Sequence, residues 1–107
     1  MIESDWKVFK KIKEQAIESF CNRALDEFRE LIDDNQEPSH NRYLLLYRLV
    51  ENRDKQMSLL FDNHSRSKAT LQLMGIRAEG LANEKMLSEL SPKFLEQTDP
   101  KAMFVNT

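Results

Sequence analysis

The segment from Ala69 to Leu81 constrains the fold of this chain more than any other. Drawn as a helix at about 100° per residue, it is apolar on two opposite sides. One side holds Ala69, Leu73 and Ile76, and the other holds Leu71, Met74 and Ala78. A helix that is apolar nearly all round must be covered nearly all round. We therefore expect neighbours on both sides, either two parts of this chain or one part of it and a second chain.

A long first helix is predicted from about Ser4, its N-cap, to about Asp33. Its apolar residues recur at spacings of three and four, which is the helical period: Trp6, Phe9, Ile12, Ala16, Phe20, Ala24, Phe28 and Leu31. In the second half, Cys21, Leu25 and Ile32 widen the apolar stripe to one side. One antiparallel neighbour would cover the first half of this helix, whereas the second half needs more cover.

A second helix is predicted from about His40 to Phe61. Pro38 interrupts the hydrogen-bond ladder before it, and Ser39 is the predicted cap. The predicted core face consists of Tyr43, Leu46, Tyr47, Val50, Met57, Leu60 and Phe61. This face would pack against the first helix.

Two charged residues of the second helix, Arg53 and Asp54, project toward its core face. Buried charges are costly unless they are paired, and Glu27 and Lys13 on the first helix are the candidate partners. The alternative, which we favour, is that both side chains extend along the apolar surface and place their charges in water at its edge.

The last third of the chain is predicted to hold two short helices. Gly80 suits the position just after the third helix, where the left-handed conformation is common. Asn83 is the predicted cap of a helix from Glu84 to Leu90. Ser91 and Pro92 predict the start of a last turn.

Together these patterns predict an all-α fold, a long antiparallel helical hairpin with a third helix and two short C-terminal helices packed across it. The chain of 107 residues has only 2 Gly and 3 Pro, and turn-rich β architecture needs more of both. Short connections favour antiparallel neighbours. Gly75, inside the third helix, costs about 1 kcal/mol relative to alanine and indicates close approach of another backbone. We predict one helical domain over residues 1–97 and a flexible tail over 98–107.

Composition limits the partners that we expect. The net charge is −2 and the pI is about 5.7, whereas general nucleic-acid binders are usually strongly basic. No stretch approaches the roughly 20 apolar residues that span a bilayer, so we predict no membrane partner. The single cysteine, Cys21, excludes an intrachain disulfide. This cysteine usage predicts a cytoplasmic protein.

Charge is divided unevenly between the first two helices. The stretch from Glu14 to Glu37 holds eight acidic and two basic residues, a net charge of −6. The stretch from Arg42 to Lys68 holds six basic and three acidic residues, a net charge of +3. Two antiparallel helices of opposite sign attract along their rims, which sets their register more than it adds stability.

The densest polar cluster, Asp62 to Lys68, comes where the third helix should begin. Helix N-termini bind anions through free backbone N–H groups. A candidate anion site consists of His64, Ser65, Arg66, Ser67 and Lys68, with Arg77 as a further cation. The alternative, which we favour, is that Ser65 or Ser67 is a plain N-cap and that the basic residues are solvated. The glycines of phosphate-binding loops are absent.

No pattern in the sequence predicts catalysis, a metal site or a cofactor. His40 and His64 are the only histidines, and neither has the spacing of a zinc motif. A small enzyme that uses His64 with Asp62 is the weakest hypothesis. Cys21 lies on the apolar stripe, where cysteine usually acts as a small buried hydrophobe.

The sequence therefore predicts a non-enzymatic protein-interaction or regulatory module that self-associates as a homodimer, with other protein partners unknown. The predicted interface comprises Cys21, Leu25, Ile32, Leu71, Met74 and Ala78. This prediction follows from apolar helical surface in excess of what one partner helix covers. The alternative function is binding of an anion or nucleic acid through Ser65–Lys68.

Overall fold

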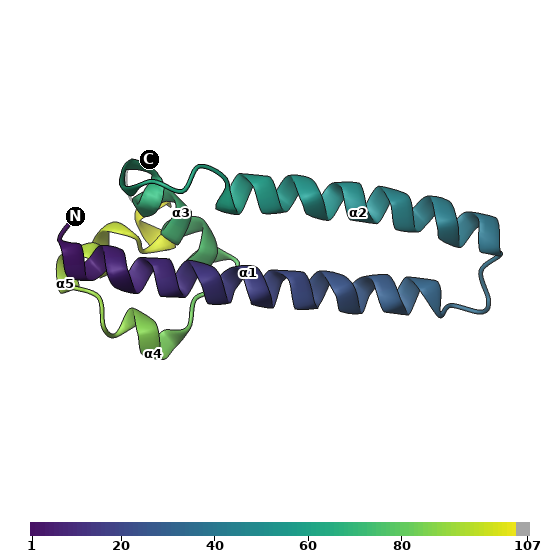
Figure 1. Cartoon of the computed structure of the whole chain (residues 1–107), viewed down its shortest axis with the longest axis horizontal. Coiled ribbons are helices and arrows are strands. Elements are labelled where there is room, and N and C mark those ends of the chain that lie inside the picture. Colours follow the sequence, from purple (N-terminus) through teal and green to yellow (C-terminus); the bar gives the residue numbers. More distant parts are fainter. Residues whose placement is uncertain (105–107) are drawn as a thin grey trace.

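The structure, a computed structural model, describes residues 1–104, and the regular elements in this range are all helical. Their bounds are α1 Glu3–Ile32, α2 Ser39–Phe61, α3 Arg66–Ala78, α4 Glu84–Leu87, α5 Pro92–Gln97 and a 3₁₀ helix η1 Pro100–Phe104. Helices α1 and α2 form a long antiparallel hairpin, and α3 to η1 pack around one end of it (Figure 1). The predicted all-α fold and its hairpin are confirmed.

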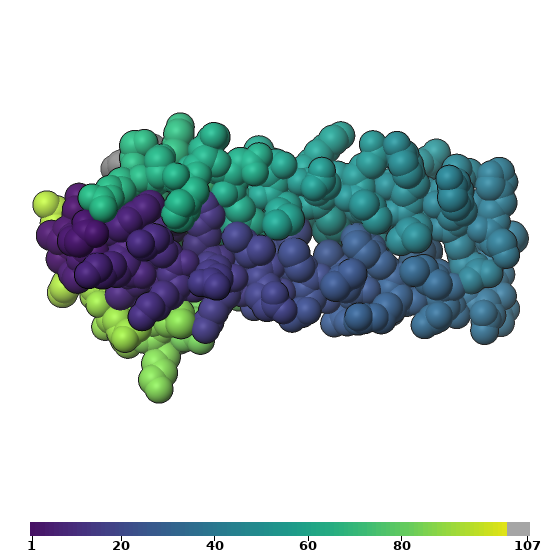
Figure 2. All heavy atoms as spheres, viewed as in Figure 1, coloured from purple at the N-terminus to yellow at the C-terminus, as the bar shows by residue number. Residues whose placement is uncertain are grey.

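The molecule is elongated because the hairpin extends well beyond the other helices. Its extents are 53 × 31 × 22 Å and its radius of gyration is 16.9 Å, against about 13 Å for a compact domain of this length. We call residues 21–57 the arm and the rest of the described chain the base. On the face seen in Figure 2, no other segment of the chain covers the two helices of the arm. Ala24, at the root, is the one buried residue of the arm.

The hydrophobic core lies in the base, between the first half of α1 and one side of α3. Six side chains of these two helices are fully buried: Phe9, Ile12, Ala16, Ala69, Leu73 and Ile76. Side chains from the end of α2 and from the segment after α3 complete the core: Phe61, Leu81, Leu87, Leu90 and Phe94. The first predicted side of α3 is therefore confirmed as core.

The second side of α3 is not covered by the described chain. Leu71 is 66% exposed, Ala78 is exposed, and Met74 is half-buried. Of the two kinds of cover that we expected, cover by this chain is wrong for Leu71 and Ala78. Gly75 faces a side chain rather than a backbone, because a Cβ there would lie 3.2 Å from Cδ2 of Leu60.

The predicted core face of α2 is wrong at three positions. Tyr43, Tyr47 and Val50 are exposed, while Leu46 and Leu49 are half-buried on the side toward α1. The segment from residue 43 to residue 50 is apolar on nearly all sides, so its period does not select one face. The side is selected instead by α1, which covers only one stripe of α2.

Several predicted helix ends are confirmed. Gly80 has φ +68°, and the N–H groups of Gly80 and Leu81 donate to the carbonyls of Arg77 and Ile76, both at 3.0 Å. This pattern is a Schellman motif. Asn83 caps α4 through the N–H of Met86 at 3.0 Å. The predicted end of this helix at Leu90 is wrong, because α4 ends at Leu87.

The start of α1 differs from the prediction. Ile2 rather than Ser4 occupies the N-cap position, with no side-chain cap, and α2 likewise begins at Ser39 after Pro38. Asp5 is buried. Its carboxylate accepts hydrogen bonds from the N–H and the hydroxyl of Ser91, at 2.8 and 2.6 Å. Ser91 also caps α5 through the N–H of Phe94, as predicted, so the two helix starts are joined.

The packed part of the chain continues past the predicted boundary at residue 98. Thr98 is fully buried. Its hydroxyl donates to the carbonyl of Phe94 at 2.8 Å and accepts from Nη1 of Arg77 at 2.9 Å. The 3₁₀ helix η1 follows and contacts α3. The tail predicted from residue 98 therefore does not begin there, and residues 105–107 lie outside the described part.

A helix can cross a membrane only if it is both long enough and apolar enough. Within residues 1–104, none of the helices combines the two to the degree required to cross a bilayer.

Candidate functional site

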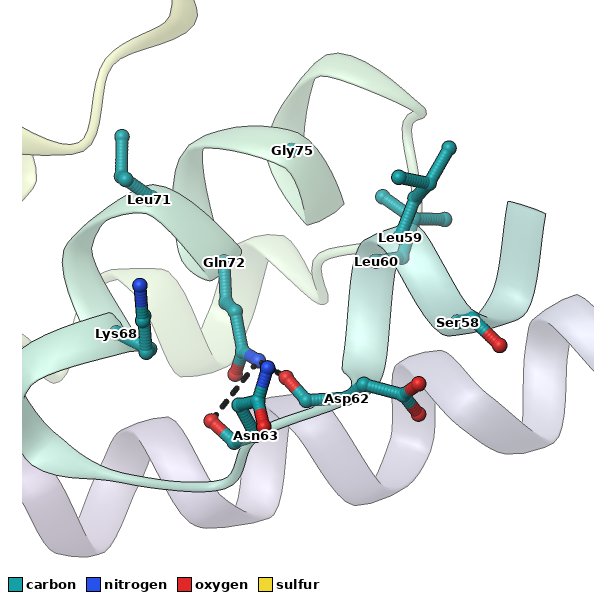
Figure 3. Close-up of a pocket in the computed structure, with 9 residues that line it drawn as sticks. All are labelled: Ser58, Leu59, Leu60, Asp62, Asn63, Lys68, Leu71, Gln72 and Gly75. Carbon is teal, nitrogen blue, oxygen red and sulfur yellow. Dashed lines mark hydrogen bonds between the residues drawn. The ribbon is translucent and has the colours of Figure 1, made fainter. Parts of the chain in front are cut away.

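We call residues 62–68, the connection between α2 and α3 together with the first residues of α3, the joint. A buried lysine of α1 holds the joint through Gln72 of α3. Lys13 is only 5% exposed, and its Nζ donates to Oε1 of Gln72 at 3.0 Å. Nε2 of Gln72 donates in turn to the carbonyl oxygens of Asp62 and Asn63 (Figure 3). Asn63 has φ +64°, so these bonds hold a left-handed residue in place.

His64 packs on aromatic rings rather than facing an acid. Its ring centroid lies 5.1 Å from that of Trp6 and 6.4 Å from that of Phe9. Nδ1 lies 3.2 Å from Nζ of Lys13. His64 is exposed as a whole, but desolvation of its ring, followed by the charges of Lys13 and Lys10, lowers the pKa of His64 below 6.5. The environment therefore favours a neutral imidazole.

Lys13 has a pKa lowered from 10.5 by burial, with the Asp62 carboxylate acting in the opposite direction. The sequence named Lys13 only as a possible partner of Arg53 or Asp54, and that role is wrong. No pattern in the sequence identifies Gln72. The sequence shows only that Gln72 is a polar residue next to Leu73 of the apolar side of α3. That pattern does not predict which groups its amide binds.

The predicted anion-binding residues are only partly brought together. Arg66 pairs with Glu3 at 3.0 Å, and its Cζ lies 5.3 Å from the ring centroid of Trp6. Ser65 occupies the N-cap position of α3 without a side-chain cap bond, and its hydroxyl lies 3.2 Å from that of Ser67.

Arg77 lies at the opposite end of α3 from the joint and donates to the carbonyl of Leu95 at 2.7 Å as well as to Thr98. Anion binding by the joint stays a prediction. We expect any oligonucleotide binding there to weaken steeply with salt and to be lost in an Arg66→Glu plus Lys68→Glu variant.

A hollow of about 290 Å³ opens beside the joint, as Figure 3 shows. Leu59, Leu60, Leu71 and Gly75 supply its apolar walls, and Gln72 and the backbone of the joint lie at its polar end. Lys68 stands at the rim (Figure 3). The amide of Gln72 is already bonded at both ends, so it offers little unused polar capacity to a ligand.

A second hollow, of about 320 Å³, lies between the two helices of the arm, and its lining is strongly apolar. The side chains of α1 that line it include Cys21, Leu25 and Phe28, and those of α2 include Val50, Asp54 and Met57. We define the arm face as Cys21, Leu25, Phe28 and Ile32 of α1 with Tyr43, Tyr47, Val50 and Met57 of α2. In each helix these residues are three, four or seven positions apart, so each set lies on one side of its helix. The exposed Asp54, between Val50 and Met57, lies on the same side and places one carboxylate within the arm face.

The other side of the arm is polar. Arg53 binds Glu27 of α1 through two hydrogen bonds, one of them from Nε to Oε1 at 3.0 Å. Arg23 and Gln56 lie beside this pair. Arg53 lowers the pKa of Glu27 mainly by hydrogen bonding, and Glu27 raises the pKa of Arg53 in the same way. Arg53 therefore pairs with Glu27, the alternative that we did not favour, and the favoured expectation of an unpaired charge in water is wrong for Arg53. Asp54 stays exposed at the hollow, as the favoured expectation has it.

The predicted interface residues fall on two separate surfaces. Cys21, Leu25 and Ile32 belong to the arm face, and Leu71, Met74 and Ala78 lie on α3 in the base. Sequence reasoning missed Tyr43 and Tyr47 as surface residues, because it assigned them to the core. Their role in an interface stays a prediction.

Two further observations bear on function. In residues 1–104 no group of three or more His, Cys, Asp and Glu side chains is arranged to hold a metal ion. No protein family, curated protein or solved structure matches the chain.

Proposed function

We propose that this chain is a non-enzymatic, cytoplasmic protein-interaction module that associates with protein chains, copies of itself included, through the arm face. The base is the folded support, and the arm is the element that docks. The single observation that carries this proposal is the exposure of large apolar side chains along one side of a two-helix arm, with Tyr47 at 61% and Tyr43 at 69%.

The physical argument concerns what an arm of two helices can bury. Two helices cover each other along one stripe only, and in residues 1–104 the end of α3 touches the root of the arm on its polar side, not on the arm face. Exposed apolar surface of this extent, bordered by polar residues, is typical of a protein-binding surface. Aromatic residues are enriched at such surfaces because they bring large apolar area together with a polar group.

Replacing Tyr47 by glutamate tests the proposal. Leu45→Glu is the matched control, because Leu45 is also exposed, at 43%, and lies two residues away, about 200° around the helix. The tagged chain is expressed in its native cells, and the apparent mass of the species that contain it is measured by size-exclusion chromatography with detection of the tag.

We expect the wild type and Leu45→Glu to elute well above the 12.6 kDa of one chain, and Tyr47→Glu to elute near that mass. A wild type that elutes as one chain contradicts the proposal. So does a Tyr47→Glu variant that stays in the same complex, and equal loss in both variants contradicts the assignment of the face.

A further inference from the structure

We infer that the arm face binds an amphipathic helix of another protein, one whose apolar side includes a lysine or arginine that pairs with Asp54. This inference rests on the proposed function and names the chemistry of the occupant. It is carried by one carboxylate that the arm places among apolar side chains, and to which the described chain brings no cation.

Asp54 lies at the wall of the apolar hollow between the two helices of the arm. Val50 and Met57 flank it on α2, and Cys21 and Leu25 of α1 line the same hollow. Asp54 is exposed, so water solvates its carboxylate while the arm is uncovered. A chain that covers the hollow removes this water, and burying a charge without a partner is costly. Any occupant of the arm face therefore has to bring a cation to Asp54.

Two arginines near the arm face are bound to acids other than Asp54. Arg53 also lines the hollow, but its guanidinium group binds Glu27 on the polar side of the arm through two hydrogen bonds. Arg29 pairs with Asp26 at 2.8 Å. Within residues 1–104, none of the ion pairs includes Asp54. The cation for Asp54 therefore has to come from a partner.

The helical neighbours of Asp54 add no positive charge. Residues three and four positions apart face one another on a helix, and for Asp54 these are Val50, Glu51, Met57 and Ser58. Glu51 brings a second carboxylate to this edge of α2. Lys55 is next in sequence and so points about 100° away around the helix. This part of the arm face is therefore acidic, and it is complementary to a basic partner.

The shape of the arm face suits a single helix. Two antiparallel helices leave a groove between them, and a third helix that lies in this groove completes a three-helix bundle. Along α2 the arm face runs from Tyr43 to Met57, roughly 20 Å at 1.5 Å per residue, so about four turns of helix cover it. Asp54 follows Tyr47 by seven residues, which is about two turns. The docked helix therefore carries its lysine or arginine about two turns from the apolar residue that packs on Tyr47.

Charge separates this occupant from others that an apolar face could bind. A nucleic acid or an anionic lipid surface presents phosphate groups, which Asp54 and Glu51 repel. A second copy of this chain has no lysine or arginine on its own arm face, so it covers Asp54 without supplying a cation. Copies of this chain therefore associate through the arm face less tightly than a helix with a matching cation binds to it.

Binding of two matched peptides tests the inference. The probe is a synthetic helix of about 18 residues, with leucine along one side and equal numbers of lysine and glutamate on the other. One position within the leucine stripe is lysine in the first peptide and glutamate in the second. Fluorescence anisotropy of each labelled peptide, titrated with the purified chain, gives the two dissociation constants.

We expect the wild type to bind the lysine peptide about tenfold or more tighter than the glutamate peptide, and Asp54→Lys to reverse this order. The reversed preference also shows that Asp54→Lys is folded. Glu30→Lys is the matched control, because it makes the same charge change at an exposed position of α1, about 200° around the helix from Phe28. A wild type that binds neither peptide, or both equally, overturns the inference. So does an Asp54→Lys variant that keeps the wild-type order, or a Glu30→Lys variant that reverses it.

The complex in native cells separates this inference from the proposed function. We expect Asp54→Lys to lose the complex as Tyr47→Glu does, and Glu30→Lys to keep it. If Tyr47→Glu loses the complex and Asp54→Lys keeps it, the proposed function stands and the inference is wrong. If the complex survives both substitutions, the proposed function and the inference both fail.

Discussion

A buried ammonium group organises the contact between α1 and the joint. Lys13 is the one lysine in the described chain that is buried, and it donates to Gln72 and contacts His64 rather than pairing with a carboxylate. The amide nitrogen of Gln72 in turn donates hydrogen bonds to the carbonyl oxygens of Asp62 and Asn63. A single amide thereby joins α1, α3 and the joint.

Replacing Gln72 by leucine removes these bonds while keeping a side chain of similar size. We expect the free energy of unfolding to fall by about 1–3 kcal/mol, because Lys13 loses a partner and two carbonyls lose a donor. Chemical denaturation measures the change. Gln97→Leu, at an exposed position of α5, is the control and should stay within about 0.5 kcal/mol. Equal effects of the two substitutions would show that the Gln72 amide contributes little.

His64 makes stability depend on pH. Its pKa is lowered below 6.5 in the folded state, so the unfolded chain binds a proton more readily, and acid favours unfolding. The contribution is complete above pH 6.5, the pKa in the unfolded chain, and is lost as the pH falls from there through the lower pKa of the folded state. We expect the wild type to lose more stability than His64→Gln between about pH 7.5 and about pH 5. Identical losses would refute this role of His64.

The sequence predicts some single-residue contacts and not others, for a physical reason. The Glu27–Arg53 pair follows from two helices known to be neighbours, with one charge on each apolar side. The partners of Lys13 depend on how α3 docks on α1, and helical periodicity carries no information about that rotation. For the same reason Asp5 was predicted at a helix start but not its bond to Ser91.

At the scale of elements, the two glycines in and after α3, Gly75 and Gly80, are expected to respond in opposite ways to replacement by alanine. Gly80 needs its left-handed backbone, which costs an alanine about 1 kcal/mol. Gly75 lies in regular helix, where alanine gains up to about 1 kcal/mol, and the end of the half-buried Leu60 side chain can shift from the added methyl group. We expect thermal unfolding to show Gly80→Ala destabilised and Gly75→Ala stabilised by about 0.5 kcal/mol. A destabilised Gly75→Ala would mean that Leu60 cannot move.

Element type was easier to predict than element orientation. The caps at Asn83 and Ser91 and the turn at Gly80 depend on local chemistry, so the sequence is sufficient for them. The exposed side of α2 depends on which of its stripes meets α1. Between Tyr43 and Val50 every side offers apolar residues, so Tyr43, Tyr47 and Val50 could be assigned to the core with equal support from periodicity. The sequence therefore shows an excess of apolar residues in α2 but does not show which of them face the solvent.

The whole molecule is divided into a base with a core and an arm without one. Backbone hydrogen bonds of a helix pair resist opening only as far as side-chain burial supports them. A partner that binds only the folded arm stabilises it by mass action. The stability of the arm should therefore depend on protein concentration, while that of the base should not.

Hydrogen exchange at different protein concentrations tests this claim most directly. On dilution from about 100 µM to about 0.1 µM, we expect backbone amides of the arm to lose protection, and Tyr47→Glu to show the unprotected pattern at all concentrations. Amides of the base, around Ile12 and Leu73, should stay protected throughout. Arm protection that is the same at every concentration, and the same in Tyr47→Glu, would contradict an arm that needs a second chain to cover it.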